Sequence, residues 1–342
     1  MTRARWLGVA ALLGLTRWWM ADGVPWLVHP IDPAELKFAE LYRLWAGGGA
    51  DLGAVSRLLG AAQNVHHGGF LPVSMLYALL ASFMGDGIGA LRAVAALTGA
   101  LTWWVWVQAA GAVGGQRVAV GMAAVMILLP PWAQQWWLTP WGSHPEAAVF
   151  TGLWVWALAD GGDDRWIGGW VGMGMAWTPM LWPTGLLALA LARSRRSAVA
   201  AVVGFGVLAG PRWLLGGAGL TESLVENPAL TMQGVVVQAF DGGALVQTLA
   251  THLPLPLVAS SVVPASAWVN GLLSAGVAFA GAVVLVGRQK AGRLLVLAPL
   301  VHWATVVVLS PLRSTLHHRY LLPWLPAVLL LPLWAGLLDR RW

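Results

Sequence analysis

Apolar runs long enough to cross a membrane follow one another along almost the whole chain. A membrane-spanning helix needs about 20 mostly apolar residues. Runs of about that length, separated by short loops with Gly, Pro or charged residues, predict about nine or ten spans. The predicted spans are residues 6–28, 90–111, 117–138, 146–160, 166–178, 180–193, 197–216, 267–287, 294–311 and 319–338. Three of them are short, and residues 166–193 are also compatible with one long span.

Two shorter apolar segments lie between the first and second predicted spans. Residues 69–85 are apolar but too short to cross comfortably, so we expect a helix that lies in or dips into the membrane interface. In residues 34–45, Ala34, Phe38, Leu41 and Trp45 recur at helical spacing, opposite Lys37, Glu40 and Arg43. This pattern predicts an amphipathic helix lying on the membrane. The fold class is therefore all-α and polytopic.

Composition strengthens the membrane interpretation. Hydrophobic residues make up 58% of the 342 residues and charged residues only 10%, with a mean hydropathy of +0.70. A soluble domain has about a quarter charged residues, so this chain could not cover a soluble surface. The 24 Trp suit membrane interfaces and helix packing. The formal charge of +6 is scattered between apolar runs, which does not indicate nucleic-acid binding. Without Cys, the chain has no disulfide or thiolate metal site.

The distribution of basic residues predicts the orientation in the membrane. Of the 20 Lys and Arg, 12 fall in short loops on one side of the predicted spans, and the positive-inside rule places that side in the cytoplasm. Both termini are then cytoplasmic in the cell (inner) membrane, and the N-terminal apolar run is an uncleaved first span. The 12 residues are Arg3, Arg5, Arg117, Arg165, Arg193, Arg195, Arg196, Arg288, Lys290, Arg293, Arg340 and Arg341.

Polar chemistry is then concentrated on the outer face. Seven of the eight His lie in the outer loops, and His302 lies in a span. The largest outer segments are residues 29–89, with the short helices, and residues 217–266. We expect one transmembrane domain over residues 1–342, with no separate soluble domain.

The stretch "WLVHPIDPAELKFAELYRLW" (26–45) holds an unusual concentration of charge for this chain. Asp32, Pro33 and Glu35 form a helix start: an N-cap, a proline in the first turn and a capping-box acid. A cap held at a helix N-terminus can also face a cavity. Asp32 is therefore either a structural cap or a catalytic acid at the membrane face.

The order of segments resembles the GT-C class of integral-membrane glycosyltransferases, such as protein O-mannosyltransferases and the aminoarabinose transferases of lipid A. Those enzymes carry an acidic motif in the first outer loop, a Gly…Arg segment before the second span and a late R-Y-x-x-P helix. The matching positions here are Asp32 with Glu35, Gly87 to Arg92, and "HHRYLLPWLP" with Arg319 and Tyr320. The chain departs from the family in D-P-A-E for adjacent acids, in "NVHHGGFLP" before the juxtamembrane helix, and in its shorter length.

The resemblance implies transfer of a sugar from a polyprenyl-phosphate carrier to an extracytoplasmic acceptor. Such a reaction needs a carboxylate that deprotonates the acceptor and donors that stabilise the phosphate. Asp32 is the predicted base, with Glu35 beside it. Arg319 is the strongest phosphate candidate, because a guanidinium binds phosphate through two parallel bonds; interfacial anchoring is its structural alternative. The other predicted substrate-binding residues are His66, His67, His317, His318 and Tyr320.

The second outer loop, "TPWGSHPEAAVF", adds His144 and Glu146. Ser143, Pro145 and Glu146 also fit an ordinary helix start. Alternatively, Glu146 supplies a second acid or, with His144, a ligand for a divalent cation. The spacing H-x-E specifies no known metal site, so no cofactor is predicted with certainty.

Two other functions remain open at this stage. A transporter would place ionisable groups at mid-membrane and often carries inverted repeats, whereas this chain gathers them at one face. A non-catalytic GT-C-fold scaffold of envelope biogenesis would keep the fold without a converging set of site residues. The partners expected on any of these interpretations are membrane lipids, with the polyprenyl-phosphate donor added for the transferase.

Overall fold

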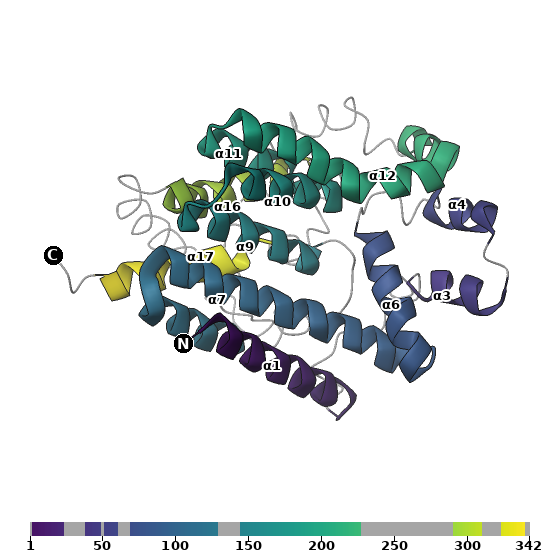
Figure 1. Ribbon diagram of the computed structural model, residues 1–342, viewed down its shortest axis with the longest axis horizontal. Helices are drawn as coiled ribbons and strands as arrows, with labels where there is room; N and C mark the ends of the chain where they lie inside the picture. Colours follow the sequence, from purple (N-terminus) through teal and green to yellow (C-terminus); the bar gives the residue numbers. More distant parts are fainter. Residues whose placement is uncertain are drawn as a thin grey trace.

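Helices form along the apolar runs, and no strand occurs among the residues that the structure describes. The computed structural model describes residues 2–23, 38–48, 51–60, 69–128, 144–226, 290–309 and 323–338. Within those ranges the chain has eleven α-helices and one 3₁₀ turn, arranged as a bundle (Figure 1). The all-α prediction is confirmed.

The second and third predicted spans form a helical hairpin in α7 (Ile88–Ile127). Its two arms meet at Gly115, whose φ of +80° is a conformation that favours glycine. The arms pack back on each other, since Trp103 Nε1 donates to the carbonyl oxygen of Ala123 at 3.1 Å. The predicted turn at "GGQR" is therefore present.

Helix α1 (Arg3–Gly23) runs antiparallel to the first arm of α7 (Figure 1). Trp6 contacts Trp103, with ring centroids 5.7 Å apart, and Trp18 Nε1 donates to the carbonyl oxygen of Gly89 at 3.2 Å. Arg17, which the sequence places inside this span, is buried and donates to the carbonyl oxygen of Met126 at 3.5 Å. An intramembrane arginine thus bonds to a carbonyl at the C-terminal end of another helix, where intrahelical partners are missing.

Residues 164–192 form two antiparallel helices rather than one long span. Helix α10 (Asp164–Trp177) is followed by the 3₁₀ turn η2 (Pro179–Leu181) and by α11 (Trp182–Ala192). Trp182 Nε1 donates to the carbonyl oxygen of Met175 at 2.7 Å, and a Cβ added at Gly185 would meet Met175 Cγ at 2.7 Å. The alternative of one long span is wrong, because the Thr178-Pro179 break directs the chain back on itself.

Helix α12 (Arg195–Glu226) lies directly against α10. A Cβ at Gly168 or Gly172 would collide with the backbone of Ser197 or Ala201. Small residues therefore let the two backbones touch, as in many membrane helix pairs. The helix also continues to Glu226, ten residues into the segment 217–266 that the sequence assigned to a loop.

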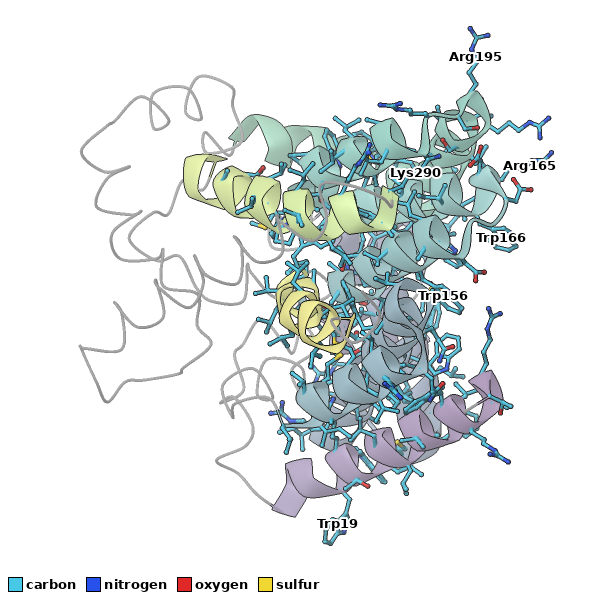
Figure 2. The ribbon with its side chains drawn as sticks, turned by 90° about the vertical axis from the view of Figure 1, so that its left-hand side faces the viewer. Trp19, Trp156, Arg165, Trp166, Arg195 and Lys290 are labelled. Atoms are coloured by element: carbon cyan, nitrogen blue, oxygen red, sulfur yellow. The ribbon has the colours of Figure 1, made fainter. Side chains whose placement is uncertain are left out.

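Helices α9 (His144–Asp160), α16 (Lys290–Leu309) and α17 (Leu325–Leu338) complete the bundle. Helix α9 is central, since it contacts α7, α10, α16 and α17. The fully buried Trp103, Trp106 and Trp154 form much of the core, whereas Trp19 is exposed at the end of α1 (Figure 2). Two described stretches, Ile88–Ile127 and Arg195–Leu215, are long and apolar enough to cross a membrane.

Three short helices follow α1: α3 (Ala39–Ala46), α4 (Leu52–Gly60) and α6 (Phe70–Met84). The predicted helix at 69–85 is confirmed as α6. The apolar face of α3 is covered by α6 rather than left for the membrane, because Phe38 and Leu41 are buried. Trp45, predicted on that same face, is 51% exposed.

Charged residues gather at the end of the bundle where α1 and α16 begin and α9 and α11 end. Arg165, Arg195 and Lys290 lie along one side in Figure 2. Arg3 pairs with Asp160 across 3.9 Å, and Lys290 Nζ donates to the carbonyl oxygen of Ala192 at 3.2 Å. We call this the charged end; the end where α6 and α7 meet is the opposite end.

Candidate functional site

Most of the predicted site residues lie outside the described part of the chain. They are Asp32, Glu35, His66, His67, His317, His318, Arg319 and Tyr320. The backbone of His144 and the whole of Glu146 are described. The described chain resumes two to six residues after the other residues, at Phe38, Gly69 and Pro323, so the structure shows what the chain that follows each of these segments contacts.

Glu146 lies in the first turn of α9, with only 3% of its surface exposed. Helix α9 begins at His144, as the Ser-His-Pro-Glu pattern predicted. A carboxylate in a first turn interacts favourably with the unsatisfied N–H groups there. Glu146 is therefore at a helix start, as one of the two interpretations predicted. The same position places a buried acid at the N-terminal end of the central helix α9.

The segment that follows His66 and His67 is tied to the end of α10 and, through it, to α9. Gly69 N donates to the carbonyl oxygen of Trp177 at 3.2 Å. The Trp177 ring in turn contacts the Phe150 ring, with centroids 5.2 Å apart. Phe150 is one helical turn after Glu146.

The segment that follows Arg319 and Tyr320 is hydrogen-bonded to Thr151 of α9, the residue after Phe150. Thr151 Oγ1 donates to the carbonyl oxygen of Pro323 at 2.5 Å, and both residues are buried. Trp324 packs edge-on against Trp154, with centroids 6.1 Å apart. The proline of the R-Y-x-x-P motif therefore lies against α9.

The segment that follows Asp32 and Glu35 enters at the same place. Phe38 is fully buried and stacks on Phe70, with centroids 5.6 Å apart and planes 26° apart. Phe70 is the residue after Gly69. A chain of contacts thus links seven residues that we call the anchor cluster: Phe38, Gly69, Phe70, Phe150, Thr151, Trp177 and Pro323. Each of the four predicted groups of site residues lies within six residues of a member of it in sequence.

A second polar cluster, which the sequence analysis did not identify, joins α3 to the α6–α7 junction. Tyr77 donates to Asp86 Oδ1 at 2.5 Å, and Arg43 Nε donates to Asp86 Oδ2 at 3.1 Å. The Tyr77 hydroxyl and then Arg43 hold the pKa of Asp86 below its usual value, against the effect of partial burial. Burial and the Asp86 carboxylate raise the pKa of Tyr77. The local signal was Asp86 between two glycines before a helix.

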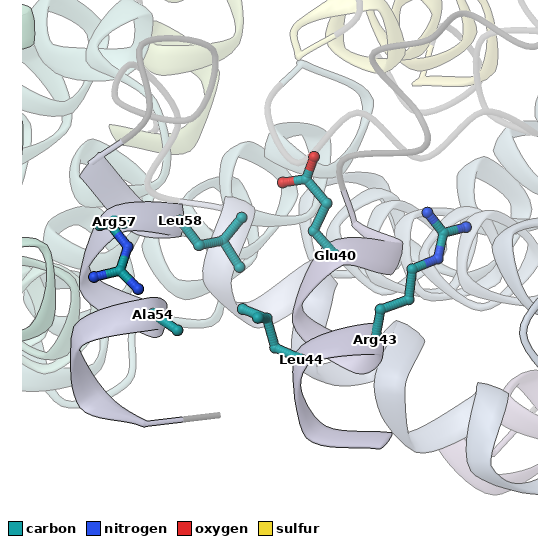
Figure 3. A pocket seen from close by; sticks show the side chains of 6 residues that line it. All are labelled: Glu40, Arg43, Leu44, Ala54, Arg57 and Leu58. Carbon is teal, nitrogen blue, oxygen red and sulfur yellow. The ribbon is translucent and has the colours of Figure 1, made fainter. Parts of the chain in front are cut away.

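An open cavity of about 460 Å³ lies between α3 and α4. Glu40, Arg43, Leu44, Ala54, Arg57 and Leu58 line it (Figure 3). Leu44 and Leu58 point into the hollow in Figure 3, whereas the Arg43 guanidinium points away from α4 and is bound to Asp86. Asp51 fixes the start of α4 by accepting from Ala54 N at 2.5 Å.

The Gly…Arg segment is present at the start of α7. Gly87 precedes the helix in extended backbone, and Arg92 lies in its second turn with 3% of its surface exposed. Burying a charged group is costly, so the fold must surround Arg92 with polar groups that replace water. In the described ranges, no three His, Asp or Glu side chains lie close enough to hold a metal ion.

Comparison with known proteins gives a match in structure but not in sequence. No protein-family model and no curated protein sequence matches the chain. The structure superposes on ArnT from Cupriavidus metallidurans, crystallised bound to undecaprenyl phosphate, with a TM-score of 0.56 and 16% identity. The match covers 98% of this chain and 60% of that one, so the protein spans three-fifths of the length of that ArnT.

At this identity the match describes the fold alone. The protein is thus an all-helical, polytopic membrane protein with the fold of that ArnT, and the predicted fold class is confirmed.

Proposed function

We propose that the protein is a membrane glycosyltransferase that moves a sugar from a polyprenyl-phosphate carrier to an acceptor outside the cytoplasm. The acceptor nucleophile attacks the anomeric carbon, and the bond from that carbon to the phosphate oxygen breaks. The nucleophile loses its proton to Asp32, and polyprenyl phosphate leaves. Glu35 assists Asp32, and Arg319 with His317, His318 and Tyr320 binds the phosphate.

The anchor cluster is the observation that carries this proposal. Four groups of predicted site residues are far apart in sequence, yet described residues two to six positions from them are linked by contacts to Phe150 and Thr151 of α9, directly or through Phe70 and Trp177. Arg319 is four residues from Pro323, which limits its Cα to about 14 Å from that anchor. A scaffold or a transporter gives no reason for an acidic motif, a His pair and an Arg-Tyr motif to adjoin one cluster.

Glu146 and the two remaining histidine groups complete the proposed site. Glu146, one turn above Phe150, serves as a second acid. His144 lies beside it in sequence, and His66 and His67 precede the Gly69 anchor. Because imidazole and carboxylate groups can donate, accept or transfer protons, they orient the sugar and the acceptor.

The fold supports the choice of carrier. The ArnT of the matching structure was crystallised with undecaprenyl phosphate, and this chain aligns with it over nearly its full length. We place the anchor cluster on the extracytoplasmic side and the charged end in the cytoplasm, with both termini. This orientation agrees with the positive-inside rule, because Arg3, Arg165, Arg195 and Lys290 lie at the charged end.

The test is donor turnover in proteoliposomes. The purified chain is supplied with a panel of undecaprenyl-phosphate sugars, and the release of undecaprenyl phosphate is measured with and without a membrane extract as acceptor. We expect one donor to be consumed. Asp32→Asn should reduce turnover at least about 100-fold, since it removes the base while keeping the size and the cap.

Two results would overturn the proposal. One is an Asp32→Asn protein that turns over its donor at the wild-type rate. The other is a folded wild-type protein that binds neither undecaprenyl phosphate nor any of its sugar derivatives, which would favour the scaffold. Asp164→Asn at the charged end is the matched control and should keep full activity.

A further inference from the structure

A second cavity, of about 690 Å³, opens at the charged end of the bundle. Helices α7, α9 and α10 form its walls, and the start of α1 lies at its mouth. Trp104, Trp156, Trp166 and Trp170 line it together with aliphatic side chains. Trp156 and Trp166 lie on the same side as Arg165 and Arg195 in Figure 2. We call this cavity the Trp groove.

The depth of the Trp groove matches one leaflet of a bilayer. Its lining on α9 extends from Val149 to Asp160, a separation of eleven residues and therefore about 16 Å along the helix. Half of a hydrocarbon core about 30 Å thick is about 15 Å, which is close to this length. An acyl chain entering at the charged end would reach the middle of the membrane at Phe150 and Met173.

The mouth of the Trp groove carries charges of both signs. Arg3 lies over the Trp156 ring at 5.2 Å and pairs loosely with Asp160 across 3.9 Å. Asp163 lies beside them, accepts from Arg165 N at 2.9 Å and pairs with the Arg165 side chain across 3.8 Å. Asp160 is 54% exposed in its side chain and Asp163 50%, so both carboxylates are open to a ligand.

We infer that the Trp groove binds one glycerophospholipid of the leaflet at the charged end, with a headgroup that carries both a phosphate and a primary ammonium. Arg3 binds the phosphate, and Asp160 with Asp163 accepts hydrogen bonds from the ammonium. One acyl chain fills the aromatic groove. The headgroup site lies at the other end of α9 from the anchor cluster, although the groove itself reaches Phe150 of that cluster, and the inference does not depend on the proposed transferase activity.

Charge complementarity selects this lipid class over the others. An anionic headgroup would satisfy Arg3 or Arg165 but would offer no donor to Asp160 and Asp163, the carboxylates with which these arginines pair. A headgroup with a quaternary ammonium would balance the charge, but it has no N–H to donate to Asp160 or Asp163. A headgroup with phosphate and primary ammonium supplies a partner for each of the three groups.

The experiment is lipid titration of the delipidated full chain in detergent, followed by native mass spectrometry. The probes are three lipids with identical acyl chains: POPE, POPG and POPC. We expect the dissociation constant of the first POPE molecule to be about fivefold lower than that of POPG or POPC. This is the factor expected for one well-formed charge pair at a surface. POPG or POPC binding as tightly as POPE would overturn the assignment.

Two variants separate the headgroup from the tail. The double variant Asp160→Asn with Asp163→Asn should remove the preference for POPE, while an asparagine side chain at the N-cap of α10 caps the helix as well as the native aspartate does. Leu153→Trp fills the groove and should weaken all three lipids, with folding checked by the unfolding temperature. A preference for POPE that survives the double variant would overturn the proposal.

The matched control is Asp164→Asn, which removes a neighbouring acid that does not line the groove. It should leave the preference for POPE unchanged. A loss equal to that of the double variant would mean that the total charge of this end, not the groove, selects the lipid, and would also overturn the proposal.

Discussion

The acidic residues at the two ends of α9 differ in burial and in environment. At its N-terminal end Glu146 is buried, beside the anchor cluster. At its C-terminal end Asp160 is exposed and paired loosely with Arg3. A similar contrast is found at other positions: Arg92 and Tyr77 are buried at the opposite end, although Arg43 there is exposed, whereas Arg3, Arg165 and Arg195 are exposed at the charged end.

This contrast separates polar groups that orient the protein from polar groups that organise a site. Exposed charges cost little and contribute little to stability, so they fit a role in topology or in contact with lipid headgroups. Buried polar groups cost several kcal/mol unless they are well placed, so the fold must position them accurately. The opposite end is therefore where loss of one side chain should matter most.

The largest effect is expected on the binding of undecaprenyl phosphate, when a substitution at Arg319 is compared with one at Arg195 of the charged end. Arg319→Gln should weaken the binding of undecaprenyl phosphate by about 50-fold, because a charge-assisted bidentate contact is lost. Arg195→Gln should leave it unchanged. Binding is measured by displacement of a labelled carrier from protein in nanodiscs. Equal losses in the two variants would contradict the assignment of the phosphate site to Arg319.

The next effect compares the two acids of α9. Glu146→Ala should lower the free energy of unfolding by about 1.5 kcal/mol, because a buried carboxylate in a first turn interacts favourably with the helix dipole. Asp160→Ala should have almost no effect, since an acid at a helix C-terminus opposes the dipole and is exposed. Denaturant unfolding in detergent measures both. Equal destabilisation would remove the contrast between the ends of α9.

A smaller effect is expected at Asp86. Tyr77→Phe should cost about 1 kcal/mol, the usual net contribution of one hydrogen bond. The folded pKa of Asp86 is below its unfolded value, so its contribution is fully present above about pH 4. It is lost as the pH falls through the folded pKa.

The wild type should therefore lose more stability than Tyr77→Phe between pH 6 and pH 3, as measured from unfolding temperatures across that range. Asp51→Asn, which keeps the cap of α4, is the control and should follow the wild type. Parallel pH profiles of wild type and Tyr77→Phe would show that Tyr77 does not hold the Asp86 pKa down.

The smallest effect is expected at the charged end. Arg3→Gln should change the free energy of unfolding by less than about 0.5 kcal/mol, because its pair with Asp160 is exposed and screened by salt. The unfolding temperature at low and at high salt checks this. A loss of several degrees would mean that Arg3 is structural, and the division between the two ends would need revision.

Much of the fold could be predicted from sequence because hydrophobic length is a strong constraint in a membrane. The apolar runs predicted α1, both arms of α7, α9, α12, α16 and α17, and the Ser-His-Pro-Glu pattern predicted where α9 begins. The helix at 69–85 was also predicted, because a short apolar run bounded by glycines has few other structures. The continuation of α12 to Glu226 was missed, since its last ten residues are less apolar.

The candidate site was predictable only as a list of residues. Asp32, Glu146 and Arg319 were singled out by local rules and by resemblance, and no local rule says that their segments meet. The Tyr77–Asp86–Arg43 cluster was missed because its members are nine and 43 residues from Asp86 in sequence. The Trp groove could not be predicted from the sequence, because its lining comes from α7, α9 and α10 and from the start of α1.

The sequence by itself determined that this is a helical membrane protein, where most of its spans lie and which residues are chemically unusual. Those properties depend on hydrophobicity, helix propensity and residue type, which each short segment carries alone. Only the tertiary structure decided that residues 164–192 fold back on themselves, that α6 covers α3, and that contacts through the anchor cluster link Phe38, Gly69 and Pro323 to α9. Such contacts depend on how side chains from distant segments fit together, and that fit exists only once the helices have packed.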